Sequence, residues 1–204
     1  MKRAIFLLFL MFNVVSFASN PRVKLIEAID VLDRFMAIPE ESIPKKLLAD
    51  AKAVAIIPDV IKAGFVVGGR YGVGVLLIKD KHSRWQGPYF IELKGGSLGW
   101  QIGVQSIDII LVFKSKESVR KLLDQKITLG ADASIAVGPV GRSALAATDI
   151  KLDYEIFSYS RSKGFFAGVS LTGAVIEMSN DLKINTDNPL AKELKKRLFE
   201  YSNW

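Results

Sequence analysis

The chain has 204 residues and a mass of 22.5 kDa, enough for one domain with a substantial core. Half of the residues are hydrophobic and 24% are charged, which excludes a disordered chain. The absence of cysteine excludes disulfides and thiolate zinc sites, and the single histidine, His82, excludes paired-histidine metal sites. The formal net charge of +7 suits a nucleic acid, an anionic lipid or an acidic partner and does not choose among them.

The first 18 residues have the pattern of a secretory signal peptide. Basic Lys2 and Arg3 precede an apolar run over residues 4–12, and Ser16 and Ala18 are small residues at the −3 and −1 positions of a cleavage site. The whole apolar stretch, about 15 residues, is shorter than the roughly 20 of a membrane-spanning helix. We therefore expect residues 1–18 to be removed, and residues 19–204 to form a periplasmic or secreted domain.

Helical patterns bracket the mature chain. Apolar residues recur at three- and four-residue steps between Pro21 and Pro39, a spacing that predicts a helix. Pro21 suits the first turn of this helix, and Pro39 suits a position just after its end. Ser115 and Asn188 are good residues to begin two further helices. The predicted helices cover residues 21–38, 45–51, 115–123 and 188–201.

Between the helices, apolar runs and alternating patterns predict strands. We expect one hairpin to turn at Tyr71 and another to turn through residues 94–97. The predicted strands cover residues 53–57, 64–70, 72–79, 87–93, 98–105, 107–113, 134–137, 153–160, 165–171 and 174–178. The fold class that follows is a single α+β domain: a mostly antiparallel, glycine-rich β-sheet or barrel-like core bracketed by N- and C-terminal helices.

No pattern for catalysis is found. The glycine cluster over residues 68–74 continues into a strand, whereas a phosphate-binding loop needs a helix there, so we expect no nucleotide cofactor. His82 lies in a polar connection and is interpreted as a solvated loop residue. The aspartates match no calcium-loop spacing. We predict no catalytic residue, no metal site and no cofactor, and therefore a protein that is not an enzyme.

Basic residues beside the glycine-rich strands are candidate lipid contacts. Cations next to aromatic rings at a hairpin end can bind lipid headgroups while the rings enter the membrane interface. The two aromatic residues of this set also fit a position in the core. The candidate lipid-binding residues are Lys62, Arg70, Lys79, Lys81, Arg84, Arg161, Lys163, Phe165 and Phe166.

Several motifs occur in an order that is typical of one family. They include Gly68-Gly69-Arg70-Tyr71-Gly72 and the run from Gly95 to Ser106. The complete set covers residues 51–58, 62–65, 68–74, 95–106, 129–134, 138–142 and 159–164. Together these motifs closely resemble the SYLF-domain family, also described as the Ysc-type actin-binding domain family, over residues 24–204.

The resemblance implies a lipid-binding domain. Eukaryotic members bind phosphoinositides, and some fungal members bind actin. The leader makes this chain similar to the stand-alone bacterial members, so we expect an anionic phospholipid surface as the partner, and neither nucleic acid nor actin. The alternative is a structural or interaction module of the cell envelope with a protein partner.

Export is the first testable expectation. The basic start, the apolar run and the small residues at positions 16 and 18 predict a mature chain that begins at Ser19 and carries a formal charge of +5, because Lys2 and Arg3 are lost. Intact-mass analysis of the exported protein measures this directly. Cytosolic protein that retains Met1 would contradict the predicted location.

Overall fold

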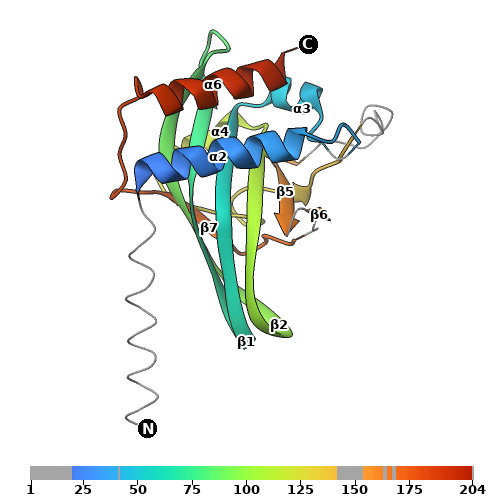
Figure 1. Cartoon of the computed structure of the whole chain (residues 1–204). Coiled ribbons are helices and arrows are strands. Elements are labelled where there is room, and N and C mark those ends of the chain that lie inside the picture. Colours follow the sequence, from blue (N-terminus) through green and yellow to red (C-terminus); the bar gives the residue numbers. More distant parts are fainter. Residues whose placement is uncertain (1–19, 41, 142–153, 163–164, 167–168, 204) are drawn as a thin grey trace.

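Two very long strands dominate the computed structural model, which describes residues 20–40, 42–141, 154–162, 165–166 and 169–203. Strand β1 (Ala53–Lys79) pairs antiparallel with β2 (Trp85–Phe113) along almost its whole length, from Ala53↔Phe113 to Lys79↔Trp85. The turn that joins them lies next to α3 and α6, and both strands bend at the opposite end of the molecule (Figure 1).

This pairing corrects the two predicted hairpins. The chain does not turn at Tyr71, which lies within β1 opposite Lys94 of β2. Residues 87–93 pair with β1 rather than with the segment from Leu98 onward, because residues 94–97 continue the strand. The real hairpin turn lies between Lys79 and Trp85.

The glycines of β1 explain why the predicted turn is absent. A Cβ atom on Gly74 would overlap the carbonyl oxygen of Ile56 and lie 2.7 Å from Ile57 Cα. A Cβ atom on Gly72 would lie 2.7 Å from Val60 Cγ2. The second half of β1 therefore packs directly against the first half, and the absence of side chains at these positions allows the backbones to approach.

The remaining strands extend the two halves of β2. Strand β5 (Ile156–Ser162) pairs antiparallel with the end of β2, and β4 (Ile135–Val137) pairs parallel with β5. Strand β7 (Val175–Met178) pairs with the first half of β2, β3 (Ile127–Thr128) with β7, and the short β6 (Phe165–Phe166) with β5. The described strands form one curled, seven-stranded mixed sheet.

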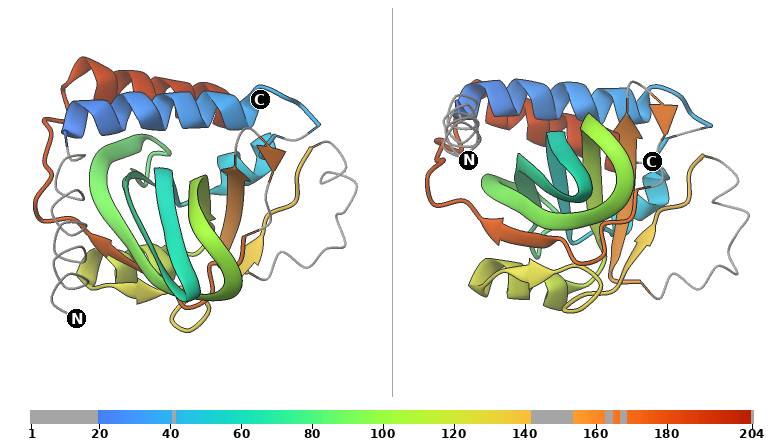
Figure 2. Two further views of the ribbon diagram at one scale, coloured as in Figure 1. Left: turned by 60° about the horizontal axis from the view of Figure 1, so that its bottom comes forward. Right: turned by 90° about the horizontal axis from the view of Figure 1, so that it is seen from below.

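Helices cover one face of the sheet (Figure 2). Helix α2 (Pro21–Met36) and helix α6 (Pro189–Ser202) lie side by side, and α3 (Lys45–Asp50) packs against α6. Asn20 and Asn188 cap α2 and α6, because their side chains accept hydrogen bonds from backbone N–H groups in the first turn. A proline follows each cap as the first residue of the helix, a position that proline favours. The core under these helices includes Leu25, Leu32, Phe35, Leu48, Ile56, Val75, Tyr159, Leu194 and Leu198.

A second core lies on the other face of the sheet. Helix α4 (Lys116–Asp124) covers it, and the side chain of Ser115 accepts hydrogen bonds from Glu117 N and Ser118 N at the start of this helix. The core includes Ala55, Ile57, Leu76, Ile91, Ile109, Leu111, Val119, Leu122 and Ile176. Because both faces are covered, the strands carry apolar residues on both sides.

The predicted α+β class is confirmed, with a mostly antiparallel sheet and helices before and after it. All four predicted helices are present, with ends shifted by no more than about two residues. The predicted strand over residues 165–171 is much shorter, since the described strand β6 covers only Phe165–Phe166. The predicted leader, residues 1–18, lies outside the described residues.

Replacement of Gly74 tests the packing of β1 against itself. We expect Gly74→Ala to lower the free energy of unfolding by about 2–3 kcal/mol, because the new methyl group overlaps backbone that cannot move independently. The matched control is Gly69→Ala in the same strand, where the nearest atom to a new Cβ, the Gly95 oxygen, is 3.9 Å away. Urea unfolding of the two variants gives the comparison, and equal stabilities would contradict the close approach.

Candidate functional site

The turn between β1 and β2 holds three of the predicted lipid contacts. Lys79 Nζ donates to the carbonyl oxygens of Ala49, at 2.7 Å, and Leu48, at 3.4 Å, and so binds the end of α3. Burial lowers the pKa of Lys79, and the neighbouring Lys52 lowers it further. Lys79 therefore has a structural role, and its Nζ atom also lies 4.6 Å from the centre of the Trp85 ring.

Asp80 organises the rest of this turn. It accepts hydrogen bonds from the backbone N–H groups of Arg84 and His82 and from the side chains of Arg84 and Gln86. These bonds, with that from Arg84 N–H the largest cause, lower the pKa of Asp80 to about 2. Arg84 is thus ion-paired, whereas the Lys81 and His82 side chains are exposed. The predicted loop position of His82 is confirmed.

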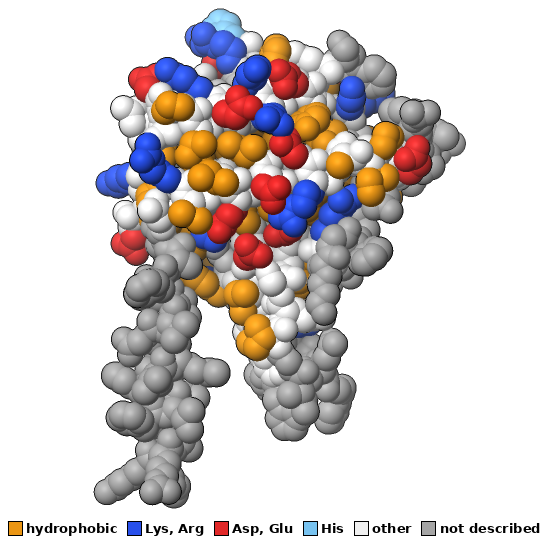
Figure 3. Space-filling view, viewed as in Figure 1, with side chains coloured by type: hydrophobic (Ala, Val, Ile, Leu, Met, Phe, Trp, Pro, Cys, Tyr) orange, Lys and Arg blue, Asp and Glu red, His pale blue; other side chains and the backbone are white. Residues whose placement is uncertain are grey.

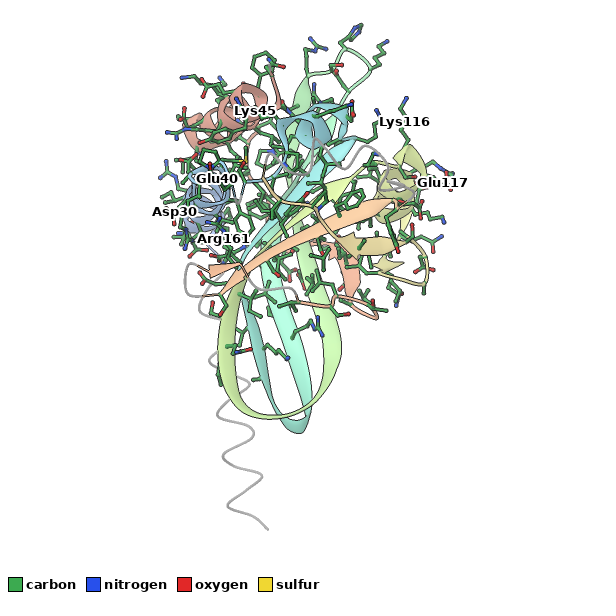
Figure 4. The ribbon with its side chains drawn as sticks, turned by 90° about the vertical axis from the view of Figure 1, so that its right-hand side faces the viewer. Asp30, Glu40, Lys45, Lys116, Glu117 and Arg161 are labelled. Atoms are coloured by element: carbon green, nitrogen blue, oxygen red, sulfur yellow. The ribbon has the colours of Figure 1, made fainter. Side chains whose placement is uncertain are left out.

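Arg161 is not on the surface, and this corrects its predicted place on a lipid-facing basic patch. Only 6% of the residue is exposed. Its Nη1 atom donates to the backbone oxygen of Arg34 at 2.6 Å, and its guanidinium lies 5.0 Å from the centre of the Phe35 ring. Arg161 therefore fastens the end of α2 to β5. Figure 4 shows it beside α2, at the same edge of the molecule as Asp30.

The other predicted contacts are dispersed. Arg70 Nη1 donates to the Ser170 carbonyl oxygen at 2.7 Å, and burial lowers the pKa of Arg70. Lys62 lies on β1 opposite Gln105 and is partly exposed. Lys163 lies outside the described residues, and the backbones of Phe165 and Phe166 form β6 beside the end of β5.

The predicted cations therefore do not form one surface. Lys79, Lys81 and Arg84 lie at the turn between β1 and β2, whereas Lys62 lies within β1, opposite Gln105 of β2 and 17 residues before Lys79. On the face shown in Figure 3, acidic and basic side chains are interspersed over the helices. A lipid site cannot rest on a joint action of all these cations.

The structure instead presents an apolar projection that the sequence analysis did not identify. Beyond the two cores, β1 and β2 continue as a two-stranded ribbon that consists of residues 61–69 and 96–106 (Figure 1). Nine of these residues are hydrophobic, and Lys62 is the single charged one. Ile61 is 44% exposed and Val104 is 71% exposed. The pairing of two distant segments creates this surface, so neither segment alone signals it.

A polar pocket of about 530 Å³ opens where the ribbon joins the body of the protein. Arg34 of α2 binds the carboxylate of Asp108 at 3.1 Å, and Asp108 also accepts a hydrogen bond from Asp59 N–H at 3.1 Å. Ser106 Oγ donates to the Asp59 carboxylate at 2.8 Å. Burial raises the pKa of Asp108, against the opposing effects of the Asp59 N–H and of Arg34. The lining comprises Arg34, Asp59, Val104, Gln105, Ser106, Asp108, Arg161 and Ser162.

The described part of the chain offers no evident metal site, since it contains no group of three His, Asp or Glu residues arranged to hold an ion. In the same part, no helix is long and apolar enough to cross a membrane. The chemistry available at the ribbon and its pocket is apolar contact together with hydrogen bonding.

Comparisons with known proteins find one matching family model and several similar proteins. Residues 94–185 match the family model Ysc84, described as a Las17-binding protein actin regulator. Protein YSC84 of Saccharomyces cerevisiae is 41% identical over 140 residues, which are 67% of this chain and 30% of that protein. LAS seventeen-binding protein 3 of the same species is 37% identical over 158 residues, 75% of this chain and 34% of that protein.

A vertebrate protein is also similar in sequence to this chain. The SH3 domain-containing YSC84-like protein 1 of Xenopus laevis is 33% identical over 162 residues, 76% of this chain and 48% of that protein. The chain thus spans less than half the length of these curated relatives. The description of the family model states Las17 binding and actin regulation, and the name of one relative, LAS seventeen-binding protein 3, also states binding.

Substitution of Arg161 tests its structural role. We expect Arg161→Ala to lower the free energy of unfolding by about 2–3 kcal/mol, because the Arg34 carbonyl loses a charged donor and the Phe35 ring loses its neighbour. Lys62→Ala, at a partly exposed cation, is the control and should change it by no more than about 0.5 kcal/mol. Urea unfolding measures both, and an equally small loss for Arg161→Ala would return this residue to the list of surface contacts.

Proposed function

The chain belongs to the SYLF, or Ysc84-type, domain family, and we propose that it is a non-enzymatic protein that binds anionic phospholipid membranes peripherally through the β1–β2 ribbon. The observation that carries this proposal is a β1–β2 ribbon whose sequence is apolar and nearly uncharged and whose Ile61 and Val104 side chains are exposed. Exposed apolar surface of this kind marks a site of contact with a membrane or another protein.

The backbone of the ribbon favours shallow insertion. Its two strands pair with each other from Ile61↔Ser106 to Gly64↔Gly103 and again from Val66↔Gly99 to Gly69↔Gly96, with a register shift between these two stretches. Among the described residues, no third strand pairs with β2 along the ribbon, since β5 and β7 pair only with residues 108–113 and 91–94. Free strand edges are not tolerated in the hydrocarbon interior, where no water is available. The ribbon therefore suits the interfacial layer of a membrane and not a crossing of it.

Positive charge has a supporting role. Lys62 lies in the ribbon, and after removal of residues 1–18 the chain would carry a formal charge of +5. Each cation near an anionic membrane surface contributes roughly 1 kcal/mol, and salt screens this attraction. Because Arg161 is buried, the expected dependence on salt is smaller than that of a dense basic patch.

The location and the alternative partner follow from different observations. The leader pattern over residues 1–18 supports export, with the periplasm or the exterior as the site of action. The name of one relative, LAS seventeen-binding protein 3, supports a second candidate function, in which the ribbon binds a protein partner. In the exported setting this partner would be a protein of the cell envelope, with actin absent.

A neutral substitution at Ile61 tests insertion of the ribbon. We expect Ile61→Gln to weaken partitioning into phosphatidylglycerol–phosphatidylcholine vesicles by about 1–2 kcal/mol, roughly 5- to 30-fold. The reason is that the variant loses the free energy gained when the apolar Ile61 side chain moves from water into the membrane. The matched control is Ile38→Gln, since Ile38 is 43% exposed and Ile61 44%, and Ile38 lies after α2 instead of in the ribbon. Vesicle sedimentation gives both values.

Two outcomes would overturn the assignment. Equal losses in the two variants would remove the ribbon from the membrane contact. Absence of vesicle binding by the unmodified protein would reject the lipid function and favour the protein partner. Quenching of tryptophan fluorescence by brominated lipids adds an independent measurement, because Trp100 belongs to the ribbon segment and Trp100→Phe should abolish most of the quenching.

A further inference from the structure

We propose that the pocket at the base of the ribbon, here called the ribbon-base pocket, binds an uncharged polyhydroxyl group such as the sugar or glycerol headgroup of a lipid. This inference rests on the proposed membrane function and extends it by giving the chemistry of the headgroup. The pocket is formed by α2, β1, β2 and β5, and its volume of about 530 Å³ falls within the roughly 300–1,000 Å³ range of small-molecule sites.

The charges that line the pocket decide among ligands. The four charged residues of the lining are Arg34, Arg161, Asp59 and Asp108, so the formal charges of the lining cancel. A phosphate in the pocket would approach both carboxylates, and a metal ion would approach both arginines. Hydroxyl groups avoid either repulsion, because each can donate to a carboxylate and accept from a guanidinium or serine.

The hydrogen bonds already present leave capacity for a ligand. Asp108 is occupied by Arg34 and Asp59 N–H, and so it fixes the pocket wall. The Asp59 carboxylate holds the hydroxyl of Ser106 through Oδ1, and its second oxygen has no hydrogen-bond partner among the described residues. The Gln105 side chain is exposed and forms no side-chain hydrogen bond within that part of the chain. Asp59 and Gln105 are both among the residues that line the pocket.

The backbone at Asp59 supports a specialised site. Asp59 has a φ of 49°, in the left-handed region, at the register shift between Ile57 and Val60 of β1. A bulge next to a site commonly directs a side chain that regular pairing would point elsewhere. Here it brings the Asp59 carboxylate to the Ser106 hydroxyl across the strands.

The position of the pocket fits a lipid headgroup. Val104, Gln105 and Ser106 line it and are also the last ribbon residues before the body. About four strand residues separate them from the middle of the β2 bend, a distance of roughly 13 Å. The hydrocarbon layer of one leaflet is about 15 Å thick. When the bend reaches the upper acyl chains, the pocket lies among the headgroups.

Vesicles with and without a glycolipid test the headgroup chemistry. We expect glucosyl diacylglycerol in phosphatidylcholine vesicles to strengthen partitioning about tenfold over phosphatidylcholine alone, and soluble methyl glucoside to compete. Asp59→Asn should abolish this gain while binding to phosphatidylcholine persists, because the amide keeps a carbonyl for Ser106, tolerates the positive φ and lacks the carboxylate. Asp124→Asn on α4, an exposed carboxylate remote from the pocket, is the control.

Backbone amide NMR with methyl glucoside separates this inference from the membrane proposal. Perturbation of Gln105 and Ser106 amides in a protein that binds no vesicle would support the pocket with a soluble sugar as the source, and it would reject membrane insertion. Equal binding to both vesicle types, with no perturbation by the sugar, would overturn the pocket and leave the ribbon intact. A preference for inorganic phosphate over the glucoside at the same amides would also overturn it.

Discussion

The fold depends on one steric constraint, the contact of β1 with itself. Gly72 and Gly74 lie against Val60, Ile57 and Ile56 so closely that a methyl group has no space at Gly74. This contact lets a single long pair of strands bend and present two layers, where larger side chains would hold the halves apart. The curled sheet, its two cores and the ribbon at the bend all follow from this approach of one backbone to another.

The two cores determine which part of the sheet is buried and which part is left available for binding. Helices α2, α3 and α6 bury one face, and α4 with its neighbouring strands buries the other. Past Val60 and Ile107, the side chains of Ile61 and Val104 are exposed. β1 and β2 remain paired along the ribbon on both sides of a register shift between Gly64 and Val66. A rigid body with an exposed apolar extension is suited to entering an interface without unfolding.

Patterns within short stretches of sequence predicted where the helices lie, but they did not predict which strands pair or where the chain turns between them. Ser115 and Asn188 act on their nearest neighbours, so their capping roles can be inferred from sequence. The glycines near Tyr71 have two explanations, a turn or a close backbone approach, and the choice depends on residues more than ten positions away. The pocket joins Arg34, Asp59 and Asp108, which are distant in sequence, and no spacing rule relates them. Its polar partners therefore could not be predicted from local patterns.

Net charge is a weak guide to function here because the fold uses many of its cations. Arg161 holds α2, Lys79 binds the end of α3, and Arg70 binds the carbonyl of Ser170. Arg34 and Arg197 are paired with Asp108 and Asp33, so these two cations are engaged within the protein. Attraction between a few free lysines and an anionic membrane is modest and screened by salt. Stable association would consequently depend on apolar burial at the ribbon, with headgroup contacts at its base determining which membrane is chosen.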